Sequence, residues 1–120
     1  MKSKDLVWRS MVALVLAAGS VWAGQATWSG AADAVWSHAG NWSTGLVPGS
    51  GDNATFSGAG NGNTTLDLGA GITLGSLLFD TAGAAAFTIG TNGNQNLTLD
   101  DNGAILRNST VTRDERITAA

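Results

Sequence analysis

The apolar residues after position 24 alternate with polar ones in short runs, and they do not follow the i, i+3, i+4, i+7 spacing of an amphipathic helix. Glycine interrupts every window long enough for a helix. Each run places two apolar side chains on one face of a strand. The runs are Leu66–Leu68, Leu77–Phe79, Phe87–Ile89 and Leu97–Leu99. Their first residues lie ten or eleven positions apart, which predicts an all-β domain of evenly spaced short strands.

Turn-forming clusters separate these runs, and they are rich in glycine and asparagine, which adopt the positive φ angles of tight corners. Strands this short carry too little apolar surface for a core of their own, but stacked coils can share one. The pattern therefore predicts that residues 57–120 form the first coils of a right-handed parallel β-helix, or β-solenoid. The alternative is a small β-sandwich built from the same strands as hairpins.

The segment 1–23 has the pattern of a secretory signal peptide. Lys2, Lys4 and Arg9 form a basic start, and Met11–Gly19 is an apolar run. Val21-Trp22-Ala23 follows, with small residues at the two positions that a signal peptidase reads. The apolar run is about half the roughly 20 residues that a membrane-spanning helix needs. We therefore expect cleavage after Ala23, export of the remaining chain, and no membrane anchor within it.

Removal of residues 1–23 would make the chain more acidic. That segment holds three of the six basic residues and one of the nine acidic ones, which leaves a net charge of 3 − 8 = −5. The remaining basic residues are Arg107, Arg113 and Arg116. A phosphate backbone would be repelled by this charge, so we expect no nucleic-acid partner. The chain has no cysteine, which excludes disulfides, thiolate metal sites and a lipid-modified cysteine.

Residues 24–56 contain all the tryptophans that follow the predicted signal peptide, namely Trp28, Trp36 and Trp42. Two interpretations compete. The rings could be a buried cap that closes the N-terminal end of the solenoid, since each indole buries a large apolar area. Alternatively, exposed rings could stack on the apolar faces of sugars, which would make the chain a small secreted carbohydrate-binding module. The sequence favours the cap, because the core is otherwise built from Leu, Ile and Ala.

Catalytic and metal-binding patterns are weak in this sequence. His38 is the only histidine, and the chain has no nucleophile elbow and no cysteine. Asp67 and Asp80 could act as paired carboxylates on a glycan. Asp100-Asp101-Asn102 lacks the further acidic ligand of a calcium loop and is more typical of a turn. We predict a protein that is not an enzyme and has no catalytic residue, cofactor or metal site.

The segment from residue 26 to 109 resembles the N-terminal region of bacterial surface proteins with autotransporter-associated β-strand repeats. That region has a Trp-Xaa-Gly element, a second Trp, an Asn-Trp pair, a Gly and a Pro, and an Asp-Xaa-Ala-Xaa-Phe ending. The matching residues here are Trp28, Gly30, Trp36, Asn41, Trp42, Gly45, Pro48, Asp52, Ala54 and Phe56. Leu74–Asp80 also looks like the first coil of that family.

The resemblance implies a secreted or surface-displayed β-solenoid with a structural, adhesin-like function. The partner that it implies is the remainder of a longer solenoid chain, whereas the stacking alternative implies a cell-surface or extracellular polysaccharide. The family is defined by architecture, so it transfers no catalytic residue. The charged segment from Arg107 to Arg116 breaks the pattern of strands. We interpret the chain as a fragment whose next coil is missing, and a polar terminal cap is the alternative.

Overall fold

A computed structural model describes residues 24–100 and 102–120. The predicted signal peptide and Asp101 lie outside the described residues. The described chain is all-β apart from two single 3-10 turns, η2 (Ala39–Asn41) and η3 (Gly60–Gly62). Its strands are β2 (Gln25–Thr27), β3 (Asn53–Phe56), β4 (Thr65–Leu66), β5 (Ile72–Leu74), β6 (Ser76–Phe79), β7 (Thr88–Ile89), β8 (Leu97–Leu99), β9 (Ile105–Arg107) and β10 (Arg116–Ile117).

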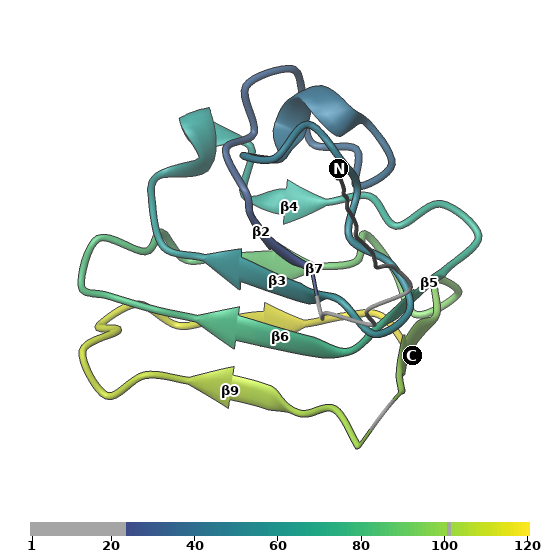
Figure 1. Cartoon of the computed structure of the whole chain (residues 1–120). Helices are drawn as coiled ribbons and strands as arrows, with labels where there is room; N and C mark the ends of the chain where they lie inside the picture. Colours follow the sequence, from purple (N-terminus) through teal and green to yellow (C-terminus); the bar gives the residue numbers. More distant parts are fainter. Residues whose placement is uncertain (1–23, 101) are drawn as a thin grey trace, which may run out of the picture.

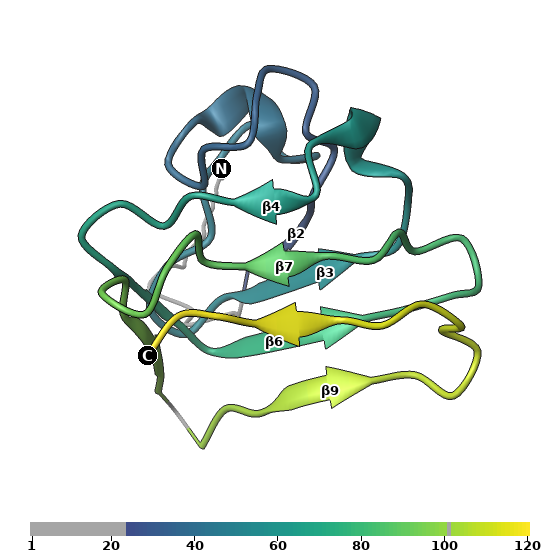
Figure 2. The same cartoon turned by 180° about the vertical axis from the view of Figure 1, so that it is seen from behind.

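The strands stack into three sheets in which every neighbouring pair is parallel. The first sheet has the order β2-β3-β6-β9 and faces the viewer in Figure 1. The second sheet has the order β4-β7-β10 and faces the viewer in Figure 2, which shows the molecule from the opposite side. Strands β5 and β8 form the third sheet. From β3 to β10 the chain visits the first, second and third sheets in a constant order. This is a β-solenoid, and the sandwich alternative, which needs antiparallel sheets, is wrong.

Four coils make up the stack, and we number them by the strand of the first sheet that opens each: coil 1 (residues 25–52), coil 2 (53–75), coil 3 (76–104) and coil 4 (105–120). The register pairs Ala26 with Ala54, Ala54 with Leu77, and Leu77 with Ile105. At this point of the stack, coils 1 and 3 are therefore equally long and coil 2 is shorter. From Leu77 through Phe87 to Leu97 the spacing of ten positions is the step from one sheet to the next, whereas the step from Leu66 to Leu77 passes over β5 of the third sheet. Neither spacing is the length of a coil.

The core is a column of side chains that stack in register inside the coils. Ala54 and Leu77 of the first sheet, and Leu66 and Ile89 of the second, have no exposed surface. In-register stacking places like side chains in contact, as Phe56 and Phe79 show with ring centroids 5.6 Å apart. Because each short strand contributes one or two inward side chains, no coil has a core of its own, and stability depends on neighbouring coils.

The predicted cap, residues 24–56, includes the two strands β2 and β3. Strands β2 and β3 belong to the first sheet of the solenoid, so only the long connection between them covers the end of the stack (Figure 1). Within that connection, Val35 forms a parallel bridge with Asp67, which places it above the second sheet. Coil 1 is thus a solenoid coil whose second and third sides are replaced by a folded loop. We call residues 28–52 the aromatic cap.

No helix in residues 24–100 and 102–120 is long and apolar enough to cross a membrane.

Candidate functional site

The three indoles of the aromatic cap pack against one another at the end of the core. The ring centroids of Trp28 and Trp42 are 5.1 Å apart and those of Trp36 and Trp42 are 4.7 Å apart, both in edge-to-face geometry. Trp42 also contacts Phe56 of β3, at 6.0 Å. Edge-to-face packing is favourable because the positive ring edge meets the negative face. The cluster therefore continues the phenylalanine column of the coils below.

Each indole N–H of this cluster donates a hydrogen bond to a main-chain carbonyl. Trp28 Nε1 donates to Asn63 O at 3.0 Å, Trp36 Nε1 to Pro48 O at 3.4 Å, and Trp42 Nε1 to Trp36 O at 2.8 Å. The exposed fractions of Trp28, Trp36 and Trp42 are 2%, 1% and 3%. The rings are thus both buried and fixed in orientation by their polar atoms.

This burial corrects one interpretation of the sequence. A sugar-stacking platform made of Trp28, Trp36 and Trp42 requires exposed ring faces. The structure buries all three rings against each other and against Phe56 of the core. They therefore form no carbohydrate-stacking surface in this structure. The competing interpretation, a buried plug, describes the geometry that is found.

Asn41 holds the loop of the aromatic cap together and is itself completely buried. Its Oδ1 accepts hydrogen bonds from the amides of Ala32 and Asp33, at 2.8 and 2.9 Å. Its Nδ2 donates to Asp33 Oδ1 and to the carbonyl of Val35, both at 2.8 Å. One side chain thereby uses all four of its hydrogen-bonding positions. In the Asn-Trp pair of the sequence motif, Asn41 thus fixes the loop by hydrogen bonds and Trp42 packs in the core.

The glycines and the proline of the motif serve the backbone of the cap. Gly30 has a φ of +61°, and a Cβ atom there would lie 2.2 Å from the carbonyl oxygen of Gly60 in the coil below. Gly45 has a φ of +73° and open space around it, so it supports a turn and no close contact. Pro48 supplies the carbonyl that accepts the Trp36 N–H.

The end of the motif joins the cap to the solenoid. Asp52 accepts the amide of Gly24 on one carboxylate oxygen and the amide of Gly49 on the other, both at 2.9 Å. Ala54 and Phe56 point inward from β3 and have no exposed surface. The structure thus gathers the matching residues of the motif into the cap and the coil directly beneath it.

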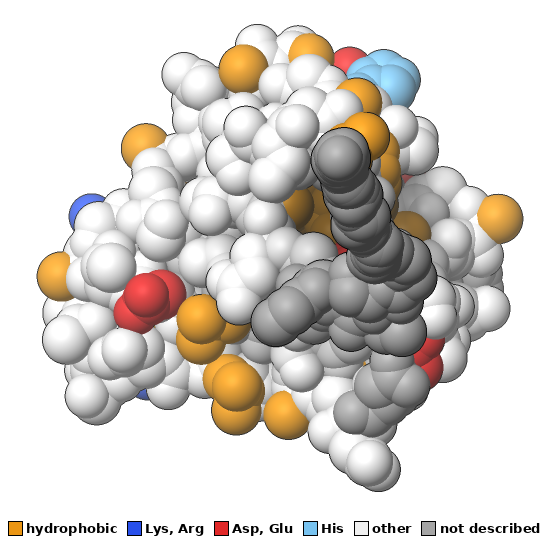
Figure 3. Space-filling view, viewed as in Figure 1, with side chains coloured by type: hydrophobic (Ala, Val, Ile, Leu, Met, Phe, Trp, Pro, Cys, Tyr) orange, Lys and Arg blue, Asp and Glu red, His pale blue; other side chains and the backbone are white. Residues whose placement is uncertain are grey.

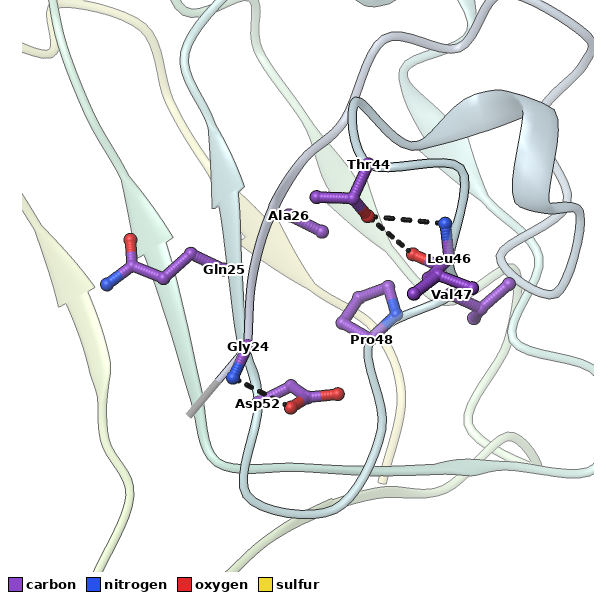
Figure 4. Close-up of a pocket in the computed structure, with 8 residues that line it drawn as sticks. All are labelled: Gly24, Gln25, Ala26, Thr44, Leu46, Val47, Pro48 and Asp52. Atoms are coloured by element: carbon purple, nitrogen blue, oxygen red, sulfur yellow. Dashed lines mark hydrogen bonds between the residues drawn. The ribbon is translucent and has the colours of Figure 1, made fainter. Parts of the chain in front are cut away.

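A shallow pocket of about 180 Å³ lies beside the cap, and Figure 4 shows its lining. Ala26, Leu46, Val47 and Pro48 provide its apolar wall. Two of its polar side chains already have partners within the chain, since Thr44 Oγ1 bonds to the main chain of Leu46 and Asp52 bonds to two amides. The side chain of Gln25 is directed away from the other lining residues in Figure 4. A ligand site needs polar groups that can orient the ligand. This pocket is therefore a surface hollow where the loop of the cap meets β2.

The side chains considered for catalysis are spread over separate corners. Asp67 follows β4 and accepts from Gln95 Nε2 at 2.6 Å, whereas Asp80 follows β6 and accepts from the amide of Thr81 at 2.9 Å. Asp100 accepts from the amide of Gly51 and from the hydroxyl of Ser50. His38 Nδ1 lies 2.6 Å from Asp33 Oδ2 at the surface of the cap. Each carboxylate thus has a local structural partner. In the described part of the chain, no three His, Cys, Asp or Glu side chains are grouped to hold a metal ion.

Gln95 is a structural residue that the sequence analysis missed. It is 7% exposed, and it links the corners of coils 2 and 3. Its Oε1 accepts the amides of Leu68 and Thr91, at 3.1 and 2.8 Å, and its Nε2 donates to Asp67. The pKa of Asp67 is lowered, first by the amide of Gly69 and then by this side chain. Gln95 lies in a turn cluster of glycine and asparagine, where a glutamine gives no signal of burial.

Asp33 is a hydrogen-bonded carboxylate of the aromatic cap. Its pKa is lowered, chiefly by the hydrogen bond from the amide of Val35, then by the side chain of Asn41 and by His38. A lowered pKa in the folded state means that the stabilisation is complete above the unfolded pKa and is lost as the pH falls through the folded pKa.

We expect the cap to loosen below about pH 4, the ordinary pKa range of Asp, and Asp33→Asn to weaken this pH dependence. Thermal unfolding followed by tryptophan fluorescence between neutral and strongly acidic pH measures the effect. Asp114→Asn removes an exposed carboxylate of coil 4 and should retain the parent pH dependence. The same pH dependence in Asp33→Asn and in the parent would contradict the role given to Asp33.

The last coil differs from the others in its inward positions. Ile105 is in register with Leu77, and Ile117 with Ile89. Leu77 and Ile89 are fully buried, whereas Ile105 is 45% and Ile117 is 36% exposed. This difference arises because β9 and β10 are the outermost strands of their sheets, and Figure 3 shows hydrophobic side chains at the surface in the region of β9. Ile105 and Ile117 are thus apolar, as the inward residues of an interior coil are, but no further strand covers them in this structure.

Arg107 occupies the third inward position, in register with Phe79. Its Nη2 donates to the carbonyls of Val111 and Arg113, at 2.8 and 3.2 Å. Glu115 ties the same coil to coil 3, because its carboxylate accepts the amide of Phe87 at 2.9 Å, and burial raises its pKa. Arg107 is a charged residue at an inward position, which a polar terminal cap predicts. Ile105 and Ile117 are apolar residues at inward positions, which an interior coil predicts.

Comparisons of the chain with protein-family models, with curated protein sequences and with solved structures found no match. The resemblance to the autotransporter-associated repeats therefore stays a prediction from the motif.

Proposed function

We propose that this chain is a non-enzymatic segment of an exported β-solenoid protein of the bacterial cell surface, and that its function is structural. In this proposal the aromatic cap closes one end of the solenoid, and coil 4 supports further coils of the same protein. The observation that carries the proposal is the contrast between the two ends. The indoles of the cap are at most 3% exposed, whereas the inward Ile105 of coil 4 is 45% exposed.

The placement of the motif residues supports membership of the autotransporter-associated repeat family. Trp28, Trp36, Trp42 and Phe56 form one aromatic cluster, and Asn41 fixes the loop that carries them. A motif whose members meet in one structural unit is a stronger match than its separate pieces. Because the indoles are buried, we assign no polysaccharide contact to them. The segment would instead support adhesive surfaces that a longer chain carries elsewhere.

The open side of coil 4 gives the test of the scaffold proposal. An uncovered strand edge with apolar side chains pairs with another edge when no coil covers it. We therefore expect the exported chain, residues 24–120, to self-associate reversibly as its concentration rises, and Ile105→Lys to abolish this association. Sedimentation velocity over a range of concentrations measures it.

Leu46→Lys is the matched control for this test, because Leu46 is also an exposed large aliphatic residue, at 73%, but lies on the loop of the cap. That variant should associate as the parent does. A parent chain that stays monomeric at every concentration would mean that coil 4 is a closed end, as the polar-cap alternative has it. Equal effects of the two lysine variants would show that association does not use the edge of coil 4.

A further inference from the structure

We propose that removal of the signal peptide creates an ion pair between the new α-ammonium group of Gly24 and the carboxylate of Asp52, and that this pair fastens the first strand to the aromatic cap. The inference rests on the export signal of the proposed function. It adds a structural role for the cleavage product, because the first residue of the exported chain becomes part of the fold.

Gly24 already lies in the position that such a pair requires. Its nitrogen donates to Asp52 Oδ1 at 2.9 Å, a bond drawn in Figure 4. Its carbonyl accepts the amide of Asn53 at 2.7 Å. Gly24 is thus held by Asp52, at the end of coil 1, and by Asn53, the first residue of β3 in coil 2. Cleavage after Ala23 would turn the same nitrogen into an ammonium group, and a charged donor makes a shorter and stronger hydrogen bond to a carboxylate than an amide does.

The carboxylate of Asp52 is fixed toward this nitrogen. Its other oxygen accepts the amide of Gly49 at 2.9 Å. A Cβ atom at position 24 would lie 2.7 Å from Asp52 Oδ1 and 3.1 Å from its Cγ. Any side chain there would have to displace the carboxylate from its two bonds. The glycine that follows the predicted cleavage site therefore leaves the space that the Asp52 carboxylate occupies.

The charges around this pocket favour a cation. Asp100 of coil 3 accepts the amide of Gly51 at 2.9 Å, so a second carboxylate lies at the turn that carries Asp52. The remaining residues that line the pocket have no titratable side chain. Arg107, Arg113 and Arg116 all lie in coil 4. The α-ammonium group is thus the cation that the fold brings to Asp52.

An opposite charge at this distance favours the protonated amine, so the pKa of the α-amino group should rise above its ordinary value of about 8. A raised pKa in the folded state means that the stabilisation is complete below the unfolded pKa and is lost as the pH rises through the folded pKa. The ion pair should therefore weaken in alkaline solution, where the amine becomes neutral.

The sequence allows a direct test, because both lysines lie within residues 1–23. After cleavage, the α-amino group is the single primary amine of the protein. The full chain is expressed in a bacterium with a Sec pathway, the exported product is purified, and its intact mass gives the first residue. The rate of acetylation by an N-hydroxysuccinimide ester, followed by mass spectrometry across a range of pH, then gives the pKa of the amine.

We expect a product that begins at Gly24, with an amine pKa about one unit above the ordinary value and acetylation about tenfold slower at neutral pH. Asp52→Asn should restore the ordinary rate. Asp114→Asn removes one negative charge from exposed coil 4 and should leave the slow rate unchanged. The titration of the parent alone decides the question if Asp52→Asn does not fold.

The outcomes separate the two proposals. A chain retained in the cytoplasm with residues 1–23 would contradict export, and the ion pair with it. An exported product with a different first residue would overturn the ion pair and leave export intact. A product that begins at Gly24 and has an amine of ordinary pKa, the same in the parent and in Asp52→Asn, would overturn the ion pair alone.

Discussion

Trp42→Ala is expected to lower the free energy of unfolding by about 3–5 kcal/mol, the range for truncation of a large buried aromatic residue. Trp42 is the centre of the aromatic cap, with Trp28, Trp36 and Phe56 all in ring contact. Its removal leaves a cavity that the loop of the cap cannot fill, since hydrogen bonds from Asn41 hold that loop in place. The carbonyl of Trp36 also loses its donor. Urea unfolding followed by circular dichroism measures the change.

Leu46→Ala is the control for this prediction, because Leu46 lies in the same loop and is 73% exposed. It should change the stability by less than about 0.5 kcal/mol. Trp42→Phe keeps an aromatic ring but loses the N–H donor, so it should fall between the two. If Trp42→Ala and Leu46→Ala had equal stability, the indole would not be part of the core.

Because the three indoles of the cap are buried, acrylamide should quench their fluorescence poorly in the folded parent.

Gly103→Ala is expected to cost about 3 kcal/mol, the upper end of the usual range for overpacking. A Cβ atom at Gly103 would lie 1.4 Å from the carbonyl oxygen of Gly75 in the neighbouring coil. One at Gly75 would lie 2.8 Å from the backbone of Gly51. The three glycines form a column at the corner where the third sheet leads into the first. Because the obstacle is backbone, no side chain can move aside, and the corner of Gly103 must move away from that of Gly75.

The separation should be local and should draw β9 away from β6, so hydrogen exchange is the best measurement of it. The amide of Leu77 donates to the carbonyl of Ala104 at 3.0 Å, and its exchange should become faster in Gly103→Ala. Gly58→Ala is the control, because a Cβ atom at Gly58 meets nothing within 4 Å. That variant should be neutral or slightly more stable, since alanine restricts the unfolded chain. Unchanged exchange of Leu77 in Gly103→Ala would mean that the column does not set the distance between coils.

The sequence predicted the sheets better than it predicted the coils. Leu66, Leu77 and Leu97 each lie on a strand, because alternation of apolar and polar residues is a local property. The length of a coil is not local, and it differs from one coil to the next with the loops that join the sheets. Phe87 shows the limit: it is fully buried, as its hydrophobicity indicates, yet β7 begins only at Thr88.

The cap was predictable as a cluster but not as a hydrogen-bonded structure. Three tryptophans in a segment beside a glycine-rich domain already favour a plug. The acceptors of their N–H groups, such as the carbonyls of Asn63 and Pro48, belong to the backbone and carry no sequence signal. Asn41 was recognised from its motif, but its four bonds depend on a loop conformation that only the complete fold defines. Gln95 was missed for the same reason.

The stacking of parallel coils has a consequence for the kinetics of folding. Every paired strand finds its partner in the adjacent coil, so the sequence separation of the pairing contacts would not grow as coils are added. However, the indole N–H of Trp28 donates to the main-chain carbonyl of Asn63 in coil 2. A chain that emerges from a translocon N-terminus first therefore cannot complete its cap until coil 2 has followed. If the chain is exported as we propose, each new coil can then fold on a finished template, in the order in which it crosses the membrane.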